Sequence, residues 1–166
     1  LHAIDATASI GTLTTTAQQY GLVLSDSSTV IVEDWTANLH NTPLLLEDGS
    51  VAHARDFVPL NTAQGSSDAV GDGTFLYGGP STSSVSTTDS GYLYETYVSF
   101  VDMNNQPVQA TSFAYGFESL ADTNGVASLP LLASGTVVEV LYDGQGVSKE
   151  LFGNQQGQTV QVIALP

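Results

Sequence analysis

The chain has 166 residues with 17 acidic side chains, 2 basic side chains, 3 histidines and no cysteine, so its formal net charge is -15. One arginine and one lysine cannot neutralise a nucleic-acid backbone or hold the chain on an anionic membrane, which excludes both partner classes. Without cysteine there is no disulfide scaffold, thiolate zinc site or cysteine catalysis, and no apolar run is long enough to span a bilayer.

Few residues of this protein are charged. Only 11% of the residues are charged, against about 25% in an ordinary soluble domain. Ser, Thr, Asn, Gln and Gly must therefore cover a core built from the 42% of hydrophobic residues. Such a composition is typical of extracellular proteins and of assemblies, and a leader peptide removed before Leu1 would agree with that location. The excess of carboxylates fits an ordinary acidic soluble protein and a protein adapted to high salt equally well, because salt screens repulsion among carboxylates.

The first half of the chain reads as a series of short strands. Residues 3–12 alternate with a period of two, which predicts a strand. Its inward face would consist of Ile4, Ala6, Ala8 and Ile10. Asp48-Gly49 predicts a hairpin turn, although residues 52–55 could also begin a short helix. Further strands are predicted over residues 22–24, 29–32, 44–46, 51–58 and 74–77.

The second half has a clearer pattern of strands and turns. Residues 81–90 are nearly all Ser and Thr, which predicts a linker. Beyond it, short strands alternate with tight turns such as Asp143-Gly144, a spacing typical of a β-sandwich. These strands are predicted over residues 92–101, 108–114, 126–132, 136–142, 147–152 and 159–165. No clean internal repeat relates the two halves. We therefore expect an all-β chain with a β-rich region over 1–80, a linker over 81–90 and a sandwich over 91–166.

A recurring motif supports the sandwich. One predicted strand ends in an aspartate, a Pro-Val pair opens the next, and an Asp-x-Asn-Gly turn precedes an apolar strand. Proline sets φ at the strand entry, and Asn-Gly supplies the positive φ of a tight turn. The residues that carry this pattern are Asp102, Pro107, Val108, Asp122, Asn124 and Gly125.

Over residues 92–165 this pattern resembles the transthyretin-like (carboxypeptidase regulatory-like) modules, and it is equally similar to bacterial Ig-like modules of surface proteins. The resemblance implies an Ig-like or transthyretin-like sandwich that serves as a spacer, stalk or assembly unit. It brings no catalytic residues to this chain.

Candidate metal ligands are sparse. His40 and His53 flank the Asp48-Gly49 turn, so a hairpin could bring them together with Asp34 or Asp56 as a zinc ligand. The usual zinc-binding spacings are absent, however, and ordinary polar or packed histidines explain the pair better. Asp122, Asn124 and Gly125 match only a fragment of a calcium loop. We expect no cofactor, apart from weak calcium binding at acidic turns.

Candidate catalytic groups are equally weak. Glu33 with Asp34, and Glu47 with Asp48, could supply carboxylates for glycoside hydrolysis, but adjacent acids in polar segments are usually solvated. No nucleophile elbow is present. Arg55 is best interpreted as one half of a structural ion pair. We therefore expect that the chain is not an enzyme.

The leading functional hypothesis is a structural subunit that self-assembles into an extracellular surface filament or fibre. Its first strand would add to a sheet in the next subunit, and its partners would be copies of itself or other structural subunits. An alternative is a virion protein that decorates a capsid or tail. A second alternative is a carbohydrate-binding surface module, in which Trp35 would stack on sugars together with several tyrosines, namely Tyr92, Tyr94, Tyr97, Tyr115 and Tyr142.

Overall fold

β-strands are the only regular elements in the computed structural model, which describes residues 1–81, 83–154 and 161–166. This confirms the all-β class. Contacts divide the chain into two compact units, Leu1–Tyr92 and Leu93–Pro166. No helix long and apolar enough to cross a membrane occurs in the described part of the chain.

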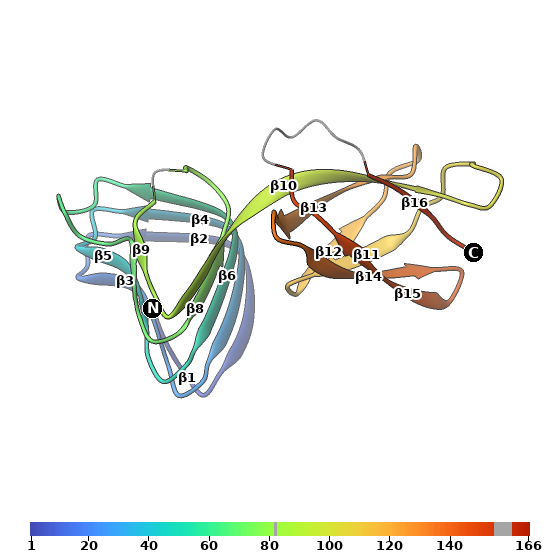
Figure 1. The fold of residues 1–166 in the computed structure, drawn as a ribbon. Coiled ribbons are helices and arrows are strands. Elements are labelled where there is room, and N and C mark those ends of the chain that lie inside the picture. Colours follow the sequence, from blue (N-terminus) through green and yellow to red (C-terminus); the bar gives the residue numbers. More distant parts are fainter. Residues whose placement is uncertain (82, 155–160) are drawn as a thin grey trace. The chain divides into compact units, whose positions relative to one another are not determined.

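The first unit is a β-solenoid, a chain wound into successive coils (Figure 1). Every second strand pairs in parallel, so the odd strands form one sheet and the even strands another. Coils follow each other at 22 residues through most of the unit, which places Thr7 beside Thr29 and Thr29 beside Val51. The strands are β1 (His2–Ile4), β2 (Thr7–Thr16), β3 (Tyr20–Ser25), β4 (Thr29–Asn38), β5 (Thr42–Leu46), β6 (Val51–Leu60), β7 (Ala69–Gly71), β8 (Thr74–Tyr77), β9 (Val85–Ser86) and the start of β10 (Asp89–Val101).

The hairpin predicted at Asp48-Gly49 is wrong. Both residues have positive φ, 55° and 68°, as a tight turn requires. They join β5 to β6, however, and these strands belong to different sheets. The turn is a corner of the solenoid, where the chain passes from one sheet to the other and each strand pairs with the strand one coil away. The short helix considered from residue 52 is also absent, since β6 covers that segment.

A 22-residue repeat, which alternation along single strands does not reveal, marks the corners. Ala17, Leu39 and Asn61 all have positive φ, between 53° and 59°, and they recur at this spacing. The backbone N–H of Ala17 donates to the carbonyl of Asn38 at 3.0 Å, and that of Leu39 donates to Leu60 at 3.0 Å. Each corner is thereby held to the next coil.

The long strands bend around the core. Buried and non-buried residues alternate along β4 and β6, but the alternation changes phase at Glu33-Asp34 and at Arg55-Asp56, where two consecutive residues are not buried. Gly11-Thr12 occupies the same place in β2. The phase change lets one strand present inward side chains on both sides of the bend.

Aromatic rings fill the core of the first unit. The ring centroids of Trp35 and Phe57, register partners on β4 and β6, are 4.9 Å apart, and Phe57 meets Phe75 edge-on at 5.3 Å. The indole N–H of Trp35 donates to Thr15 Oγ1 at 3.2 Å. Buried leucines and valines surround the rings, namely Leu22, Leu24, Val30, Val32, Leu44 and Leu46.

The Ser/Thr stretch over 81–90, expected as a linker, contains β9 and the start of β10. The Ser84 N–H donates to the Asp68 carboxylate at 2.9 Å, and the Asp68 N–H donates to the Ser84 carbonyl. The division between the units lies later, between Tyr92 and Leu93. Ser and Thr are common both in half-exposed strands and in linkers. Composition alone therefore does not distinguish the two in this segment.

The second unit packs two sheets around one core. β10 pairs antiparallel with β13 and parallel with β16, and the other sheet has the order β12-β11-β14-β15. Both sheets contribute to the buried cluster, which includes Val98, Phe100, Leu129, Leu131, Val138 and Val140. The strands are β11 (Thr111–Ala114), β12 (Phe117–Leu120), β13 (Val126–Leu132), β14 (Thr136–Tyr142), β15 (Gln145–Leu151) and β16 (Gln161–Ala164). The predicted strands at 126–132 and 136–142 are confirmed.

We predict that Gly21→Ala destabilises the first unit by about 1–3 kcal/mol, because added atoms in a packed site force their neighbours apart. A Cβ at Gly21 would lie 2.6 Å from Thr15 Oγ1 and 2.9 Å from His40 Nε2. Urea unfolding followed by fluorescence of the single tryptophan, Trp35, measures this unit. The control is Gly11→Ala, where a Cβ meets nothing within 4 Å. Equal stability of the two variants would contradict the prediction.

Candidate functional site

The first coil of the solenoid has an open edge. Within the described residues, β1 pairs only with β3 and β2 pairs only with β4. The outer backbone groups of both strands therefore have no strand partner in the described chain. The edge of β2 is ten residues long, with the sequence TASIGTLTTT. It contains neither a charged residue nor a proline.

Such an edge is unusual because native proteins normally protect edge strands against addition by other chains. They do so with charges, prolines or very short strands. The two strands behind β2 carry such groups: β4 has Glu33 and Asp34, and β6 has Arg55, Asp56 and Pro59. Of these three strands, β2 at the edge is the one without them, although the inner strands β3 (YGLVLS) and β8 (TFLY) are also free of charge and proline.

The residues expected on one inward face do not share a strand. A corner at Asp5, with φ 46°, separates β1 from β2. Ile4 lies before the corner and is 56% exposed, whereas Ala8 and Ile10 pack against the core. The single strand over 3–12 is therefore corrected to two strands. Leu13, which the alternation did not indicate, joins the inward set after the bend.

The first coil is held firmly by its own unit. The terminal ammonium group of Leu1 donates to the Gly21 carbonyl at 3.0 Å, and the Val23 N–H donates to the Leu1 carbonyl at 2.9 Å. The Thr29 N–H donates to the Ala6 carbonyl at 2.8 Å. Residues 1–16 are thus part of the solenoid, and the outer side of β1 and β2 has no strand partner among the described residues.

The two histidines are not brought into a metal site. His40 is 1% exposed at the turn after β4, with Nδ1 3.0 Å from the Gln18 carbonyl oxygen. His53 is half-buried in β6, in register with Ile31 and Leu76. Within the part of the chain that the structure describes, no group of three or more His, Cys, Asp or Glu side chains could hold a metal ion.

Carboxylates stack along the corners of the solenoid. The Asp26 N–H lies 3.5 Å from Asp48 Oδ2, and the Gly49 N–H donates to Asp72 Oδ1 at 3.3 Å. Asp48 and Asp72 also border a shallow pocket with Glu47. These carboxylates accept hydrogen bonds from the backbone of the neighbouring coil, and the weak calcium binding expected at acidic turns stays a prediction.

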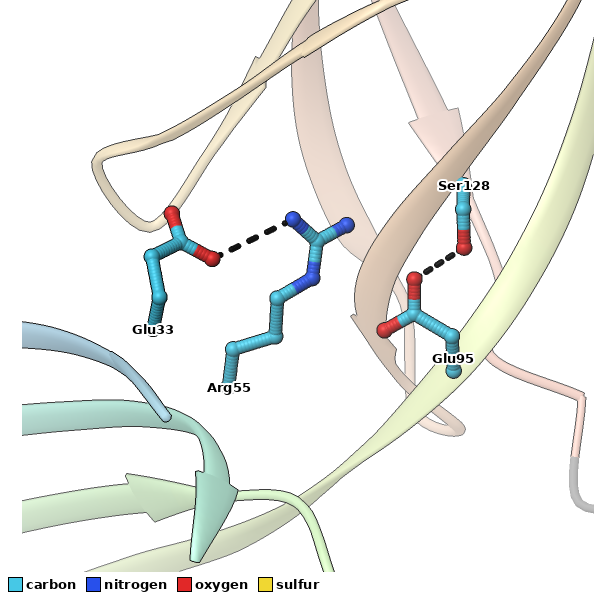
Figure 2. A network of polar contacts seen from close by, with 4 residues as sticks. All are labelled: Glu33, Arg55, Glu95 and Ser128. Carbon is cyan, nitrogen blue, oxygen red and sulfur yellow. Dashed lines mark hydrogen bonds and ion pairs between the residues drawn. The ribbon is translucent and has the colours of Figure 1, made fainter. Parts of the chain in front are cut away.

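Arg55 forms the structural ion pair expected from the sequence. Its Nη1 lies 3.3 Å from Glu33 Oε2, and Figure 2 shows the guanidinium group pointing at that carboxylate. The pair joins the bends of β4 and β6, where Asp34 and Asp56 are register partners. Arg55 therefore adds a positive charge where acidic side chains stack. Within the second unit, Ser128 Oγ donates to the Glu95 carboxylate.

Trp35 is not available for stacking on a sugar. The side chain is 1% exposed and packs against Phe57 in the core. Trp35 is therefore excluded as the sugar-stacking residue of the carbohydrate-binding alternative. Alternation along β4 did not distinguish an inward from an outward tryptophan, because the phase change at residues 33–34 decides which way it points.

The motif residues of the second unit form two matching turns. Asp102 Oδ1 accepts hydrogen bonds from the Asn104 and Gln106 N–H groups, both at 2.8 Å. Asp122 Oδ1 accepts equivalent bonds from Asn124 at 2.8 Å and Val126 at 2.9 Å. The hydrogen bond from Gln106 lowers the pKa of Asp102, and that from Val126 lowers the pKa of Asp122; partial desolvation opposes both effects.

The other motif residues bring the two turns together. Gly125 has φ 74°, and a Cβ there would lie 2.5 Å from the Phe100 carbonyl oxygen. Pro107 forms a bridge with Val101, and the Val108 N–H donates to the Phe100 carbonyl at 3.1 Å. These contacts give the motif a structural role in closing the end of β10.

Comparisons with protein-family models, with curated proteins and with solved structures found no match to this chain. The features that bear on function are therefore those of the chain itself: the neutral open edge of the first coil and the paired aspartate turns of the second unit.

We predict that the double variant Asp102→Asn/Asp122→Asn flattens the acid dependence of the stability of the second unit. A folded-state pKa below the unfolded one contributes stability above about pH 4, and this contribution is lost as the pH falls through the lowered value. Amide hydrogen exchange in β13 and β14 between pH 2 and 6 measures the effect. The control is Asp143→Asn, at an exposed turn of the same unit. An unchanged acid slope in the double variant would contradict the prediction.

Proposed function

We propose that this chain is a non-enzymatic structural subunit of an extracellular surface filament or fibre, which assembles by β-strand addition at its first coil. The observation that carries the proposal is the ten-residue edge of β2, which has no charge, no proline and no strand partner on its outer side within the described residues. An edge of this kind is a template for another strand.

The chemistry of such an edge suits assembly more than catalysis. Main-chain hydrogen bonds supply affinity, and alternate side chains determine the register of the added strand. The outward residues Ser9 and Thr14 are exposed, and the inward residues Ala8 and Ile10 already contact the core. An added strand would therefore extend both the ladder and the core.

The second unit fits the role of a spacer. We infer an Ig-like or transthyretin-like module from the two sheets around one core and from the Asp102 and Asp122 turns. A spacer module needs a stable fold and few binding or reactive groups on its surface. A surface of uncharged polar residues, in a chain with 11% charged residues, agrees with a position outside the cell.

The proposal is tested by charging the edge. We predict that Ser9→Glu/Thr14→Glu abolishes assembly, because carboxylates on the open edge repel an incoming strand of this acidic chain. Sedimentation velocity over a range of protein concentrations, with electron microscopy of the wild type, measures the assembly state.

The matched control is Thr29→Glu/Thr36→Glu, which adds the same charge to β4, one coil inside the edge. This variant should assemble like the wild type. A wild-type chain that stays monomeric at every concentration would refute the proposed function, and so would a Ser9→Glu/Thr14→Glu chain that assembles normally.

A further inference from the structure

We infer that the outer face of the β12-β11-β14-β15 sheet is a docking surface for a short segment of a partner protein, in which aliphatic residues alternate with lysine or arginine. This sheet belongs to the second unit, whereas the β2 edge belongs to the first. The inference is therefore independent of strand addition. It adds one binding surface to the unit that is proposed above as a spacer.

The strand register defines which side chains lie on this face. Val138 and Val140 of β14 are buried in the core of the second unit. The residues that alternate with them, Val137, Glu139 and Leu141, therefore lie on the outer face. Their register partners on the neighbouring strands share that face, which consists of three cross-strand rows: Leu120, Thr111, Leu141 and Gly146; Glu118, Phe113, Glu139 and Ser148; and Val137 and Glu150.

The face is apolar for a side of a sheet that is turned to solvent. An antiparallel sheet that packs one face on a core normally carries polar side chains on the other. Here Val137 is 66% exposed, Leu120 65% and Leu141 48%. Both leucines are register partners of Thr111, and Phe113, two residues further along the same strand, is half-buried. Exposed apolar side chains that gather in this way are typical of a protein-binding surface.

Glutamates are interspersed among these apolar side chains. Glu118 and Glu139 are register partners of Phe113 on its two sides, and Glu150 is the register partner of Val137. All three carboxylates belong to exposed residues. None of them forms an ion pair with a side chain in the described part of the chain. The face therefore combines exposed aliphatic groups with three negative charges that have no counter-charge among the described residues.

These carboxylates determine the charge of the partner. A partner that covers the apolar side chains also removes water from the glutamates between them, and a carboxylate that loses water without a counter-charge is costly. The face has no basic side chain to supply that charge, because Lys149 pairs with the buried Val138 and so lies on the opposite side of the sheet. Basic side chains of the partner would supply it, and its aliphatic side chains would cover the leucines.

A second copy of these 166 residues fits the face poorly. Its basic residues are Arg55 and Lys149, and Arg55 is paired with Glu33 in the first unit. A net charge of -15 on each copy also opposes their approach, whereas a basic partner is attracted. The size of the face favours a short segment over a folded domain, because three inter-strand spacings make it roughly 15 Å wide.

Binding of a synthetic probe tests the inference on the full chain. The probe is an eight-residue peptide of alternating lysine and leucine, and amide chemical shifts of the isotope-labelled protein report where it binds. Shifts should change along β11, β12 and β14, and the Kd should rise with salt because the ion pairs are screened. Peptides of alternating lysine and serine, or glutamate and leucine, should each bind about tenfold more weakly or worse, since each lacks one of the two kinds of contact.

A charge variant tests the contribution of the glutamates. Glu118→Gln/Glu139→Gln should raise the Kd of the lysine–leucine peptide by about tenfold, because it removes the carboxylates on both sides of Phe113. The matched control is Asp34→Asn/Asp56→Asn, which removes two charges from exposed positions of the first unit. This control should leave the Kd nearly unchanged, and it separates a local effect from weaker attraction by the chain as a whole.

An apolar variant tests the contribution of the leucines. Leu120→Thr/Leu141→Thr should also raise the Kd by about tenfold, and threonine keeps a β-branched side chain in each strand. The matched control is Leu60→Thr/Met103→Thr, which removes two exposed apolar side chains outside this sheet. The control should bind the lysine–leucine peptide like the wild type.

Shift changes on this sheet that weaken in both test variants, and in neither control, support the docking surface. Three results refute it: no shift change on β11, β12 and β14 at millimolar peptide, shift changes confined to the first unit, or an equal loss of binding in a test variant and its control. None of these results bears on the assembly state of the chain, so the docking surface and the proposed function stand or fall separately.

Discussion

The parallel backbone ladder between coils is the constraint on which the first unit depends. Because each strand pairs with the strand one coil away, equivalent side chains stack on each other. Trp35 lies beside Phe57 in the core, and Glu33 lies beside Arg55 at the bend. The same stacking places the Ser28 N–H 3.1 Å from Ser50 Oγ at a corner. The contacts in the core, at the corners and at the bends thus all follow from the register in which one coil pairs with the next. The stability of such a repeat depends mainly on contacts between neighbouring coils.

Among the described residues, the first coil of the solenoid has a neighbouring coil on one side only. Ile10 and Val32 are equivalent positions, yet Val32 is buried and Ile10 is not. The missing coverage coincides with a strand that carries no charge, although the chain as a whole is strongly acidic. Together, these two features of β2 support the proposed role, in which a partner strand pairs with β2 and covers its inward side chains.

Several aspartates of this chain accept hydrogen bonds from its own backbone. Asp102 and Asp122 each accept two backbone hydrogen bonds that hold a turn, and Asp68 accepts one from Ser84 in the last coil of the first unit. The hydrogen bonds from Gln106 and Val126 lower the pKa of Asp102 and of Asp122, respectively, because they stabilise the charged carboxylate. They help to define turns in a chain that has very few other charges with which to fix its geometry.

The sequence by itself determined the elements whose signals are local. Strands at 74–77, 126–132 and 136–142 were predicted with their observed bounds, and Asp143-Gly144 joins two paired strands. Tertiary structure alone decided which strands pair, because a turn such as Asp48-Gly49 has the same local chemistry in a hairpin and at a solenoid corner. It also decided that Trp35 points inward and Ile4 outward. Both outcomes depend on burying a core shared by residues 22 positions apart, and alternation within one strand carries no information about that spacing.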